Sequence, residues 1–260
     1  MDELARVRDL YGEPRPGPHD QARVWRRVQA GRRRSRLPWL AVPAVATALA
    51  LAFVIPGLPE RHIDGRSVLL SAATTAAATG SEGTYWHVSK LHGGTRVTEL
   101  WVTRQGRAWI AEQGEITRVT GRSPFSMAGR DLTYQQIQAL PSDAAALRAR
   151  VAAILPAGSE GLLADALSGL LWTKPSTPGV RAAAYRALAD LPEVRYLGAR
   201  QDARGRAGEA FSFDLPSGVE RTLIIDPVTS QVLSCEDGGH GGRSEIVLGA
   251  GWTDRGPDLP

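Results

Sequence analysis

Cysteine is nearly absent from this chain: Cys235 is the only one in 260 residues. A single thiol excludes any disulfide within the chain, so the folded part must rely on an ordinary hydrophobic core. We interpret Cys235 as a small strand residue that is partly buried, with an intermolecular or reactive thiol as the alternative. Lysine is almost as scarce, because only Lys90 and Lys174 occur among the 31 basic residues.

Recognisable catalytic and metal-binding patterns are missing as well. The sequence contains no G-x-S-x-G nucleophile elbow, no H-E-x-x-H pair and no phosphate-binding loop. His87 and His92 fall five residues apart in one expected strand, which places them on opposite faces and prevents them from sharing a metal ion. The glycine-rich segment around His240 is interpreted as a flexible loop, because no helix is expected after it. We therefore predict a protein that is not an enzyme and needs no metal or other cofactor.

One long apolar run is the clearest positive feature of the chain. Residues 37–58 carry no charged side chain and directly follow the basic residues 32–36. A run of about 20 apolar residues can cross a bilayer as one helix, and flanking arginines stay on the cytoplasmic side. We predict a single-pass protein of the cell (cytoplasmic) membrane, with its N-terminus inside and its C-terminal domain outside. A cleaved secretory signal is the alternative, although the run is longer than a usual signal core.

The net charge is distributed unevenly on the two sides of this run. Residues 1–36 form a basic cytoplasmic tail with 10 arginines and 5 acidic residues, whereas the rest of the chain carries a net charge of −1. The tail is expected to favour anionic membrane lipids, and the nearly neutral outer part gives no sign of nucleic-acid binding. Within the tail, Val24, Trp25 and Val28 fall on one side of an expected helix. They are either part of a membrane-surface segment or a docking surface for a cytosolic partner.

Beyond the span, the expected elements follow the order strands, helices, strands. Residues 59–83 read as a juxtamembrane linker with a helix in its alanine-rich part. Short strands separated by glycine-containing turns are expected between 84 and 120 and again between 194 and 250, and three amphipathic helices between 142 and 190. We predict an α+β fold in which an antiparallel sheet of two meanders packs with about three helices. The extracytoplasmic domain would cover residues 84–250, followed by a flexible C-terminus at 251–260.

Three tryptophans are the candidate ligand-binding residues. Trp86, Trp101 and Trp109 fall on three successive expected strands. Large aromatic side chains there could line an apolar hollow that accepts an acyl chain or a peptide. Ordinary packing under the three helices is the alternative interpretation.

Two stretches resemble a known kind of protein. The segment RAAAYRALADLPEVRYLGARQDARGRAGEAFSFD with the later LIIDPVTSQVL, and LPSDAAALRARV at 140–151, are similar to an uncharacterised actinobacterial family of single-pass membrane proteins. Such proteins are often encoded near extracytoplasmic-function sigma factors. More distantly, the layout resembles the LolA/RseB type of domain, a curved antiparallel sheet closed by helices over an apolar hollow.

The resemblance implies a non-enzymatic binding or sensing domain outside the cell. We expect an envelope-sensing regulator that reaches a cytosolic partner, such as a sigma factor, through its tail. The alternative is a membrane-tethered carrier of lipids or lipoproteins. The expected partners are membrane lipids, a cytosolic regulatory protein, and a lipid or peptide ligand outside the cell.

Overall fold

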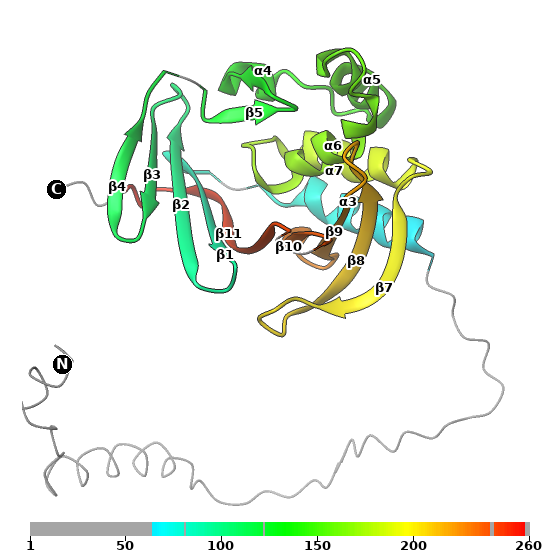
Figure 1. Ribbon diagram of the computed structural model, residues 1–260. Coiled ribbons are helices and arrows are strands. Elements are labelled where there is room, and N and C mark those ends of the chain that lie inside the picture. Colours follow the sequence, from blue (N-terminus) through cyan, green and yellow to red (C-terminus); the bar gives the residue numbers. More distant parts are fainter. Residues whose placement is uncertain (1–63, 81, 122, 240–241, 258–260) are drawn as a thin grey trace, which may run out of the picture. The chain divides into compact units, whose positions relative to one another are not determined.

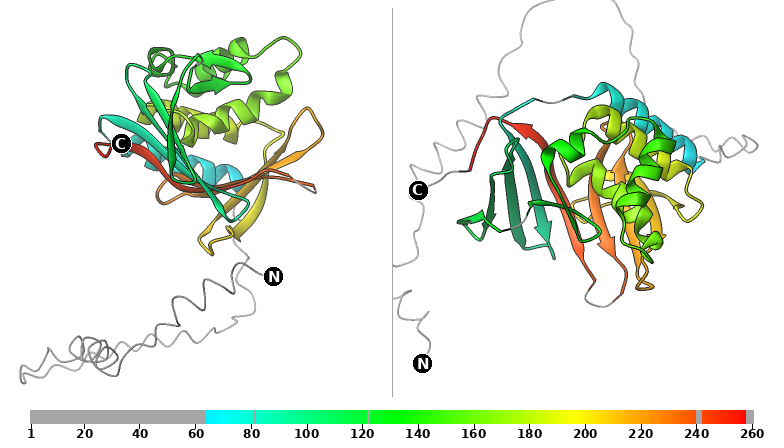
Figure 2. Two further views of the ribbon diagram at one scale, coloured as in Figure 1. Left: turned by 60° about the vertical axis from the view of Figure 1, so that its left-hand side comes forward. Right: turned by 90° about the horizontal axis from the view of Figure 1, so that it is seen from above.

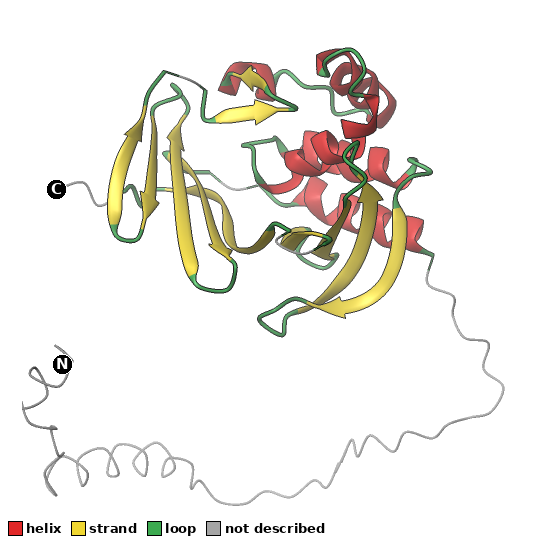
Figure 3. Cartoon of the chain, viewed as in Figure 1, coloured by secondary structure: helices red, strands yellow, loops and turns green. Residues whose placement is uncertain are grey.

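The structure, a computed structural model, describes residues 64–80, 82–121, 123–239 and 242–257. These residues form an α+β architecture with a large antiparallel sheet and helices packed against it, as Figures 1 and 3 show. The coarse fold prediction is therefore confirmed. Within the same residues no helix is both long and apolar enough to cross a membrane. The predicted span at 37–58 and the predicted tail at 1–36 lie outside the described residues.

Nine strands form one continuous sheet in the order β4-β3-β2-β1-β11-β10-β9-β8-β7. The first meander consists of β1 (Tyr85–His92), β2 (Arg96–Thr103), β3 (Ala108–Glu112) and β4 (Glu115–Val119). The second consists of β7 (Arg195–Gln201), β8 (Ala207–Asp214), β9 (Glu220–Asp226) and β10 (Gln231–Asp237). The last strand, β11 (Ser244–Thr253), pairs with both β10 and β1 and so joins the two meanders.

Five α-helices and a short 3-10 helix complete the described part of the chain. They are α3 (Gly65–Ala78), α4 (Tyr134–Gln138), α5 (Ala144–Ile154), η1 (Glu160–Leu162), α6 (Leu163–Trp172) and α7 (Pro178–Ala189). A separate hairpin, β5 (Phe125–Met127) with β6 (Arg130–Leu132), precedes α4. Seen from two further directions in Figure 2, this hairpin lies apart from the main sheet.

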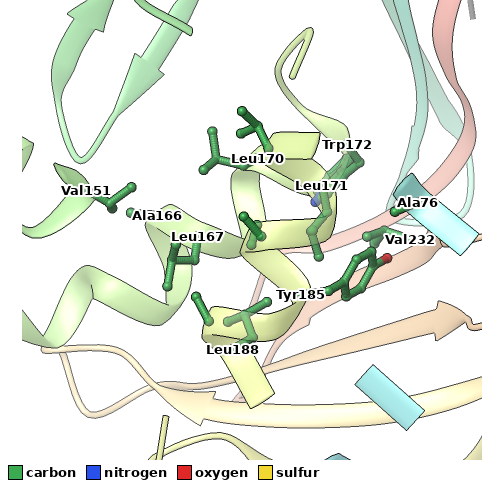
Figure 4. Close-up of a cluster of buried hydrophobic side chains, with 14 of the residues drawn as sticks. Ala76, Val151, Ala166, Leu167, Leu170, Leu171, Trp172, Tyr185, Leu188 and Val232 are labelled. Carbon is green, nitrogen blue, oxygen red and sulfur yellow. The ribbon is translucent and has the colours of Figure 1, made fainter. Parts of the chain in front are cut away.

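The hydrophobic core lies where α3, α6 and α7 pack against one another and against the second meander. Helix α7 is buried almost all round, and its Tyr185 hydroxyl donates a hydrogen bond of 3.0 Å to the backbone carbonyl of Ser230. In Figure 4, the Tyr185 side chain points toward Val232. Leu167 and Leu170 of α6 belong to the same cluster of buried side chains. Burial of this kind favours folding by about 25 cal/mol per Å² of apolar surface. The core therefore holds the second meander and the helices together.

The predicted strands and helices are largely confirmed, with three differences. The three helices expected between 142 and 190 are α5, α6 and α7, but α4 and the β5–β6 hairpin were not predicted. Helix α3 falls in the predicted linker at 59–83, and its Leu69 and Ala72 belong to the hydrophobic core. The expectation of a loose chain from Gly249 onward, and of a flexible C-terminus from 251, is wrong as far as Thr253. Trp252 packs edge-on against Trp86 and so ties that end of β11 to β1.

Candidate functional site

A cleft of about 590 Å³ lies over the inner face of the first meander. Its walls come from β1 to β4, from the chain around the β5–β6 hairpin, and from α6 with the residues that follow it (Figure 1). A volume of several hundred Å³ is typical of small-molecule sites. The main apolar lining residues are Val88, Leu100, Ile110, Val119, Phe125, Met127 and Trp172.

Cross-strand pairing explains the apolar floor of the cleft. Val88 of β1 is opposite Leu100 of β2, which in turn is opposite Ile110 of β3. Alternate residues of a strand share a face, so these three side chains form one row across the meander. Val88 is 2% exposed, whereas Ile110 is 36% exposed, so the row becomes more open toward the edge of the sheet.

The β5–β6 hairpin forms the opposite wall. Its turn places Ala128 and Gly129 in the left-handed backbone region, with φ of 47° and 79°. A non-glycine residue is uncommon there, and a two-residue turn of this hand fits the twist of the flanking strands. Phe125 and Met127 on β5 are each 2% exposed and line the cleft. The Ser123 hydroxyl donates a hydrogen bond to the Leu132 carbonyl and closes the base of the hairpin.

Charged side chains gather at the end of the cleft nearest α6 and β10. Arg221 of β9 is 7% exposed and forms ion pairs with Asp165 of α6 and with Asp237 of β10, the latter at 2.6 Å. The hydrogen bonds that Arg221 donates to Asp237 raise the pKa of Arg221, so this guanidinium stays charged. Both carboxylates are bound to the same arginine, so the triad is held together without a ligand, and one guanidinium against two carboxylates leaves it with a net negative charge.

A second group of charges surrounds Glu245 of β11, which is 5% exposed. Its carboxylate lies 2.7 Å from Arg243 and 3.4 Å from Lys90. Burial opposes the charge on Glu245, but the hydrogen bond from Arg243 and the nearby positive charges outweigh it, so its pKa is lowered. Burial also lowers the pKa of Lys90, whose ammonium lies 4.7 Å from the centre of the Trp172 ring. This distance allows a cation–π contact.

Lys174 also lines the cleft, two residues after the end of α6, and it is only 6% exposed. Its ammonium donates a hydrogen bond of 3.1 Å to the Thr173 hydroxyl. Burial lowers the pKa of Lys174 to about 8, with Asp165 opposing the shift and Lys90 adding to it. Near neutral pH this side chain is therefore charged, buried and without a carboxylate ion pair among the described residues.

Cys235 lies in β10, is 3% exposed and also lines the cleft. Burial raises the pKa of its thiol to about 12, so the thiol is protonated at neutral pH. A protonated thiol is a poor nucleophile and metal ligand. The interpretation of Cys235 as a buried strand residue is confirmed.

The three predicted tryptophans are not among the residues that line the cleft. Trp86 is 2% exposed and belongs to the hydrophobic core. Trp101 and Trp109 are register partners on β2 and β3. Trp101 stacks on His87 at 4.8 Å between ring centres, which places it on the opposite face of the meander from Trp86. The structure therefore does not bring the three side chains together.

The histidine prediction is confirmed by the two faces of β1. His87 lies 3.0 Å from Glu99, and His92 lies 2.7 Å from the Thr98 hydroxyl on the other face. In the described part of the chain no group of three metal-ligating side chains is placed to hold an ion. His240 lies outside it, as do the tail residues that were predicted to dock a partner (Val24, Trp25 and Val28).

The charged residues of the cleft were not predicted from the sequence, although one signal pointed to them. The chain uses arginine almost exclusively, and both of its lysines line this one cleft. The two lysines of a chain that otherwise uses arginine therefore lie together at this cleft. No protein-family model matches the chain, and no curated protein matches it.

Proposed function

We propose that this protein is a membrane-anchored, non-enzymatic binding protein whose extracytoplasmic domain takes its ligand in the cleft over the first meander. The observation that carries the proposal is the cleft itself: about 590 Å³ between a sheet face and a separate hairpin, with apolar walls and a charged end. Mixed lining of this kind is usual for sites that bind one small molecule.

The chemistry of the charged groups supports binding more than catalysis. A general base must accept a proton near neutral pH, and carboxylates, histidines and lysines of lowered pKa are the usual groups. With a pKa of about 8, Lys174 is mostly protonated at pH 7. Asp165 and Glu245 are bound by arginines, and the pKa of Glu245 is lowered. Burial keeps the Cys235 thiol protonated. These groups are suited to positioning a ligand and to keeping the cleft polar at one end.

The overall layout supports the same proposal by analogy. A large antiparallel sheet with helices on one side and a hollow between them resembles the LolA/RseB arrangement that the sequence suggested. Such a likeness concerns architecture, and function has to be argued from the site. The cell-membrane location rests on the apolar run at 37–58 and its basic flank.

A cleft-filling substitution tests the proposal. Leu100 is half-buried on the cleft floor, whereas Val97 is on the same strand, is 42% exposed and does not line the cleft. The full chain, its Leu100→Trp variant and its Val97→Trp variant would be purified from membranes of the native host and examined by native mass spectrometry. We expect a bound mass on the wild type and on Val97→Trp that is lost on Leu100→Trp. A wild type that carries no bound mass, or an equal mass on both variants, would overturn the proposal.

Two roles of this binding protein, a sensor and a carrier, lead to different expected results. If the protein is a sensor that signals to a sigma factor, deleting residues 1–30 changes transcription of the envelope-response genes while the outer domain stays folded. If it is a carrier of lipids or lipoproteins, the same deletion leaves transcription unchanged and the bound mass is that of a lipid or lipopeptide. A silent deletion removes the sensor role. A bound mass that corresponds to neither class removes the carrier role.

A further inference from the structure

The two lysines of the chain lie in one place although they are 84 residues apart in sequence. Lys90 is on β1, the first strand of the first meander, and Lys174 follows α6, yet both line the same cleft. Lysine is a compact point charge on a flexible stem, whereas arginine is a planar fork that suits bidentate pairing. In a chain with 31 basic residues, the only two ammonium side chains therefore lie at this one cleft.

The two ammonium groups have different partners. Lys90 has Glu245 at 3.4 Å and the Trp172 ring beneath it. Lys174 is more deeply buried and has one hydrogen-bond acceptor among the described residues, the Thr173 hydroxyl. An ammonium carries three donors, so two of them have no acceptor in this part of the chain. A buried charge in that condition is destabilising unless something else binds it.

The nearby carboxylates do not supply the missing partner. Asp165, which acts on Lys174 through space, is already bound to Arg221. Glu245 is bound to Arg243 and Lys90. Cys235 is protonated and brings no negative charge. The positive charge of Lys174 is therefore left for a ligand.

The space beside Lys174 is open on the side that faces the cleft. Gly169 is in the last turn of α6, where a side-chain Cβ would come within 2.9 Å of the Lys174 ammonium. Glycine inside a helix is unfavourable by about 1 kcal/mol relative to alanine, so its presence there needs a reason. The Lys174 ammonium therefore packs directly against Gly169, in the place that a side chain would take, and both residues line the cleft together with Val88 and Ile110.

We infer that Lys174 binds the anionic group of the ligand, a carboxylate or a phosphate at one end of an apolar chain. This inference rests on the proposed function, because it names the chemistry of the molecule that the cleft takes. Lys90 and the Trp172 ring form the surface beside Lys174 at the same charged end of the cleft. The groups that face Lys174 are Asp165 from α6 and Lys90 from β1, with Arg221, Arg243 and Cys235 lining the same cleft.

Titrations with four soluble probes test this assignment. The full chain in phosphatidylcholine nanodiscs would be titrated at pH 7 with octanoate, octyl phosphate, 1-octanol and inorganic phosphate, and protein-free nanodiscs would be subtracted. The variants are Lys174→Met, which keeps the length and removes the charge, and Lys174→Arg, which keeps the charge. Arg200→Met, an exposed arginine on the edge strand β7, is the matched control.

We expect Lys174→Met to weaken octanoate or octyl phosphate binding about 10- to 100-fold, the usual effect of losing a hydrogen bond to a charged group. Binding of 1-octanol should be unchanged, and both Lys174→Arg and Arg200→Met should bind the anions within a few-fold of the wild type. The better of the two anionic probes identifies the headgroup, and binding of inorganic phosphate alone would show that the apolar chain is not needed.

The outcomes separate this inference from the proposed function. If octanoate, octyl phosphate and 1-octanol all bind the wild type and Lys174→Met equally, the cleft binds apolar chains and the role of Lys174 is wrong. If none of the four probes binds the wild type, the inference fails and the proposed ligand class fails with it, whereas a bound mass that Leu100→Trp removes still supports a binding cleft. Circular dichroism of each variant checks that it is folded.

Discussion

The two meanders of the sheet differ in what covers their inner faces. Over the second meander, Phe211, Phe213, Leu223 and Ile225 are 1–3% exposed, and they border a space of about 10 Å³, close to the size of one water molecule. Over the first meander, the corresponding face borders a cleft of about 590 Å³. One continuous sheet therefore has a packed half and an open half.

The difference suggests a division of roles, in which the packed half stabilises the fold and the open half is the proposed binding surface. The helices α3, α6 and α7 cover the packed half with buried side chains that belong to one hydrophobic core. The open half is bordered by the small β5–β6 hairpin, and its charged end contains a buried lysine that forms no ion pair with a carboxylate of residues 64–80, 82–121, 123–239 or 242–257. Sites of this kind commonly reduce stability and are retained because function needs them.

The largest expected effect is the loss of a core side chain in the packed half. Phe213 of β8 is 1% exposed, and Phe213→Ala should lower the free energy of unfolding by about 3–5 kcal/mol because it leaves a cavity that cannot fully collapse. Urea denaturation followed by tryptophan fluorescence measures the change. Val228, which is 80% exposed, is the control, and Val228→Ala should stay within about 0.5 kcal/mol of the wild type. Equal losses for the two variants would contradict the division into two halves.

The second-largest effect is expected at Lys174, where a substitution should raise the free energy of unfolding instead of lowering it. Its pKa is about 8 in the folded protein against 10.5 for the free side chain, so the unfolded chain binds more protons between these values. The free energy of unfolding should therefore rise as the pH increases from about 8 to about 10.5. At pH 7 the charged form is unfavourable in the folded state, and Lys174→Met should raise the free energy of unfolding by an amount on the order of 2 to 3 kcal/mol.

Urea denaturation at pH 7 and at pH 10 checks this prediction. Lys174→Met should stabilise the protein more at pH 7 than at pH 10, because the lysine of the wild type is mostly neutral at the higher pH. Lys174→Arg should give no gain, since a guanidinium stays charged throughout this range. A marked destabilisation by Lys174→Met would show that the ammonium supports the fold rather than a ligand.

The smallest expected effect concerns the floor of the open half. Leu100 is only half-buried, so Leu100→Ala should lower the free energy of unfolding by about 1 kcal/mol, well below the loss at Phe213. The same variant should weaken binding of the octyl probes, because part of the apolar wall is removed. Val97→Ala, on the exposed part of the same strand, should change neither quantity. A loss at Leu100 as large as that at Phe213 would mean that the cleft is filled by side chains in solution.

Much of the packed half could be predicted from the sequence because its signals are local. The strands β7 to β10 fall in the expected range 194–250, and the helices α5, α6 and α7 fall where amphipathic periodicity placed them. Helix α5 is capped by Asp143, whose carboxylate accepts a hydrogen bond from the backbone amide of Ala146, within one residue of the position 142 at which the helices were expected to begin.

The open half depends on contacts that are distant in sequence, and these could not be predicted. The pairing of Trp86 with Trp252 joins β1 to β11 across more than 160 residues of sequence, and no local sequence pattern predicts it. The tryptophans were placed on one surface because strand faces were not assigned, whereas the register puts Trp101 opposite His87 and away from Trp86. The scarcity of lysine was visible in the sequence, but only the fold brings Lys90 and Lys174 to one cleft.

Hydrogen–deuterium exchange of the full chain in phosphatidylcholine nanodiscs tests the division most directly, with and without saturating octanoate or octyl phosphate. We expect the ligand to slow amide exchange in β1–β4 and in the hairpin that contains Phe125, while β8 and β9 exchange at the same rates with and without the ligand. Slower exchange confined to the second meander, or no change anywhere with a ligand that demonstrably binds, would contradict the claim that the open half is the binding site.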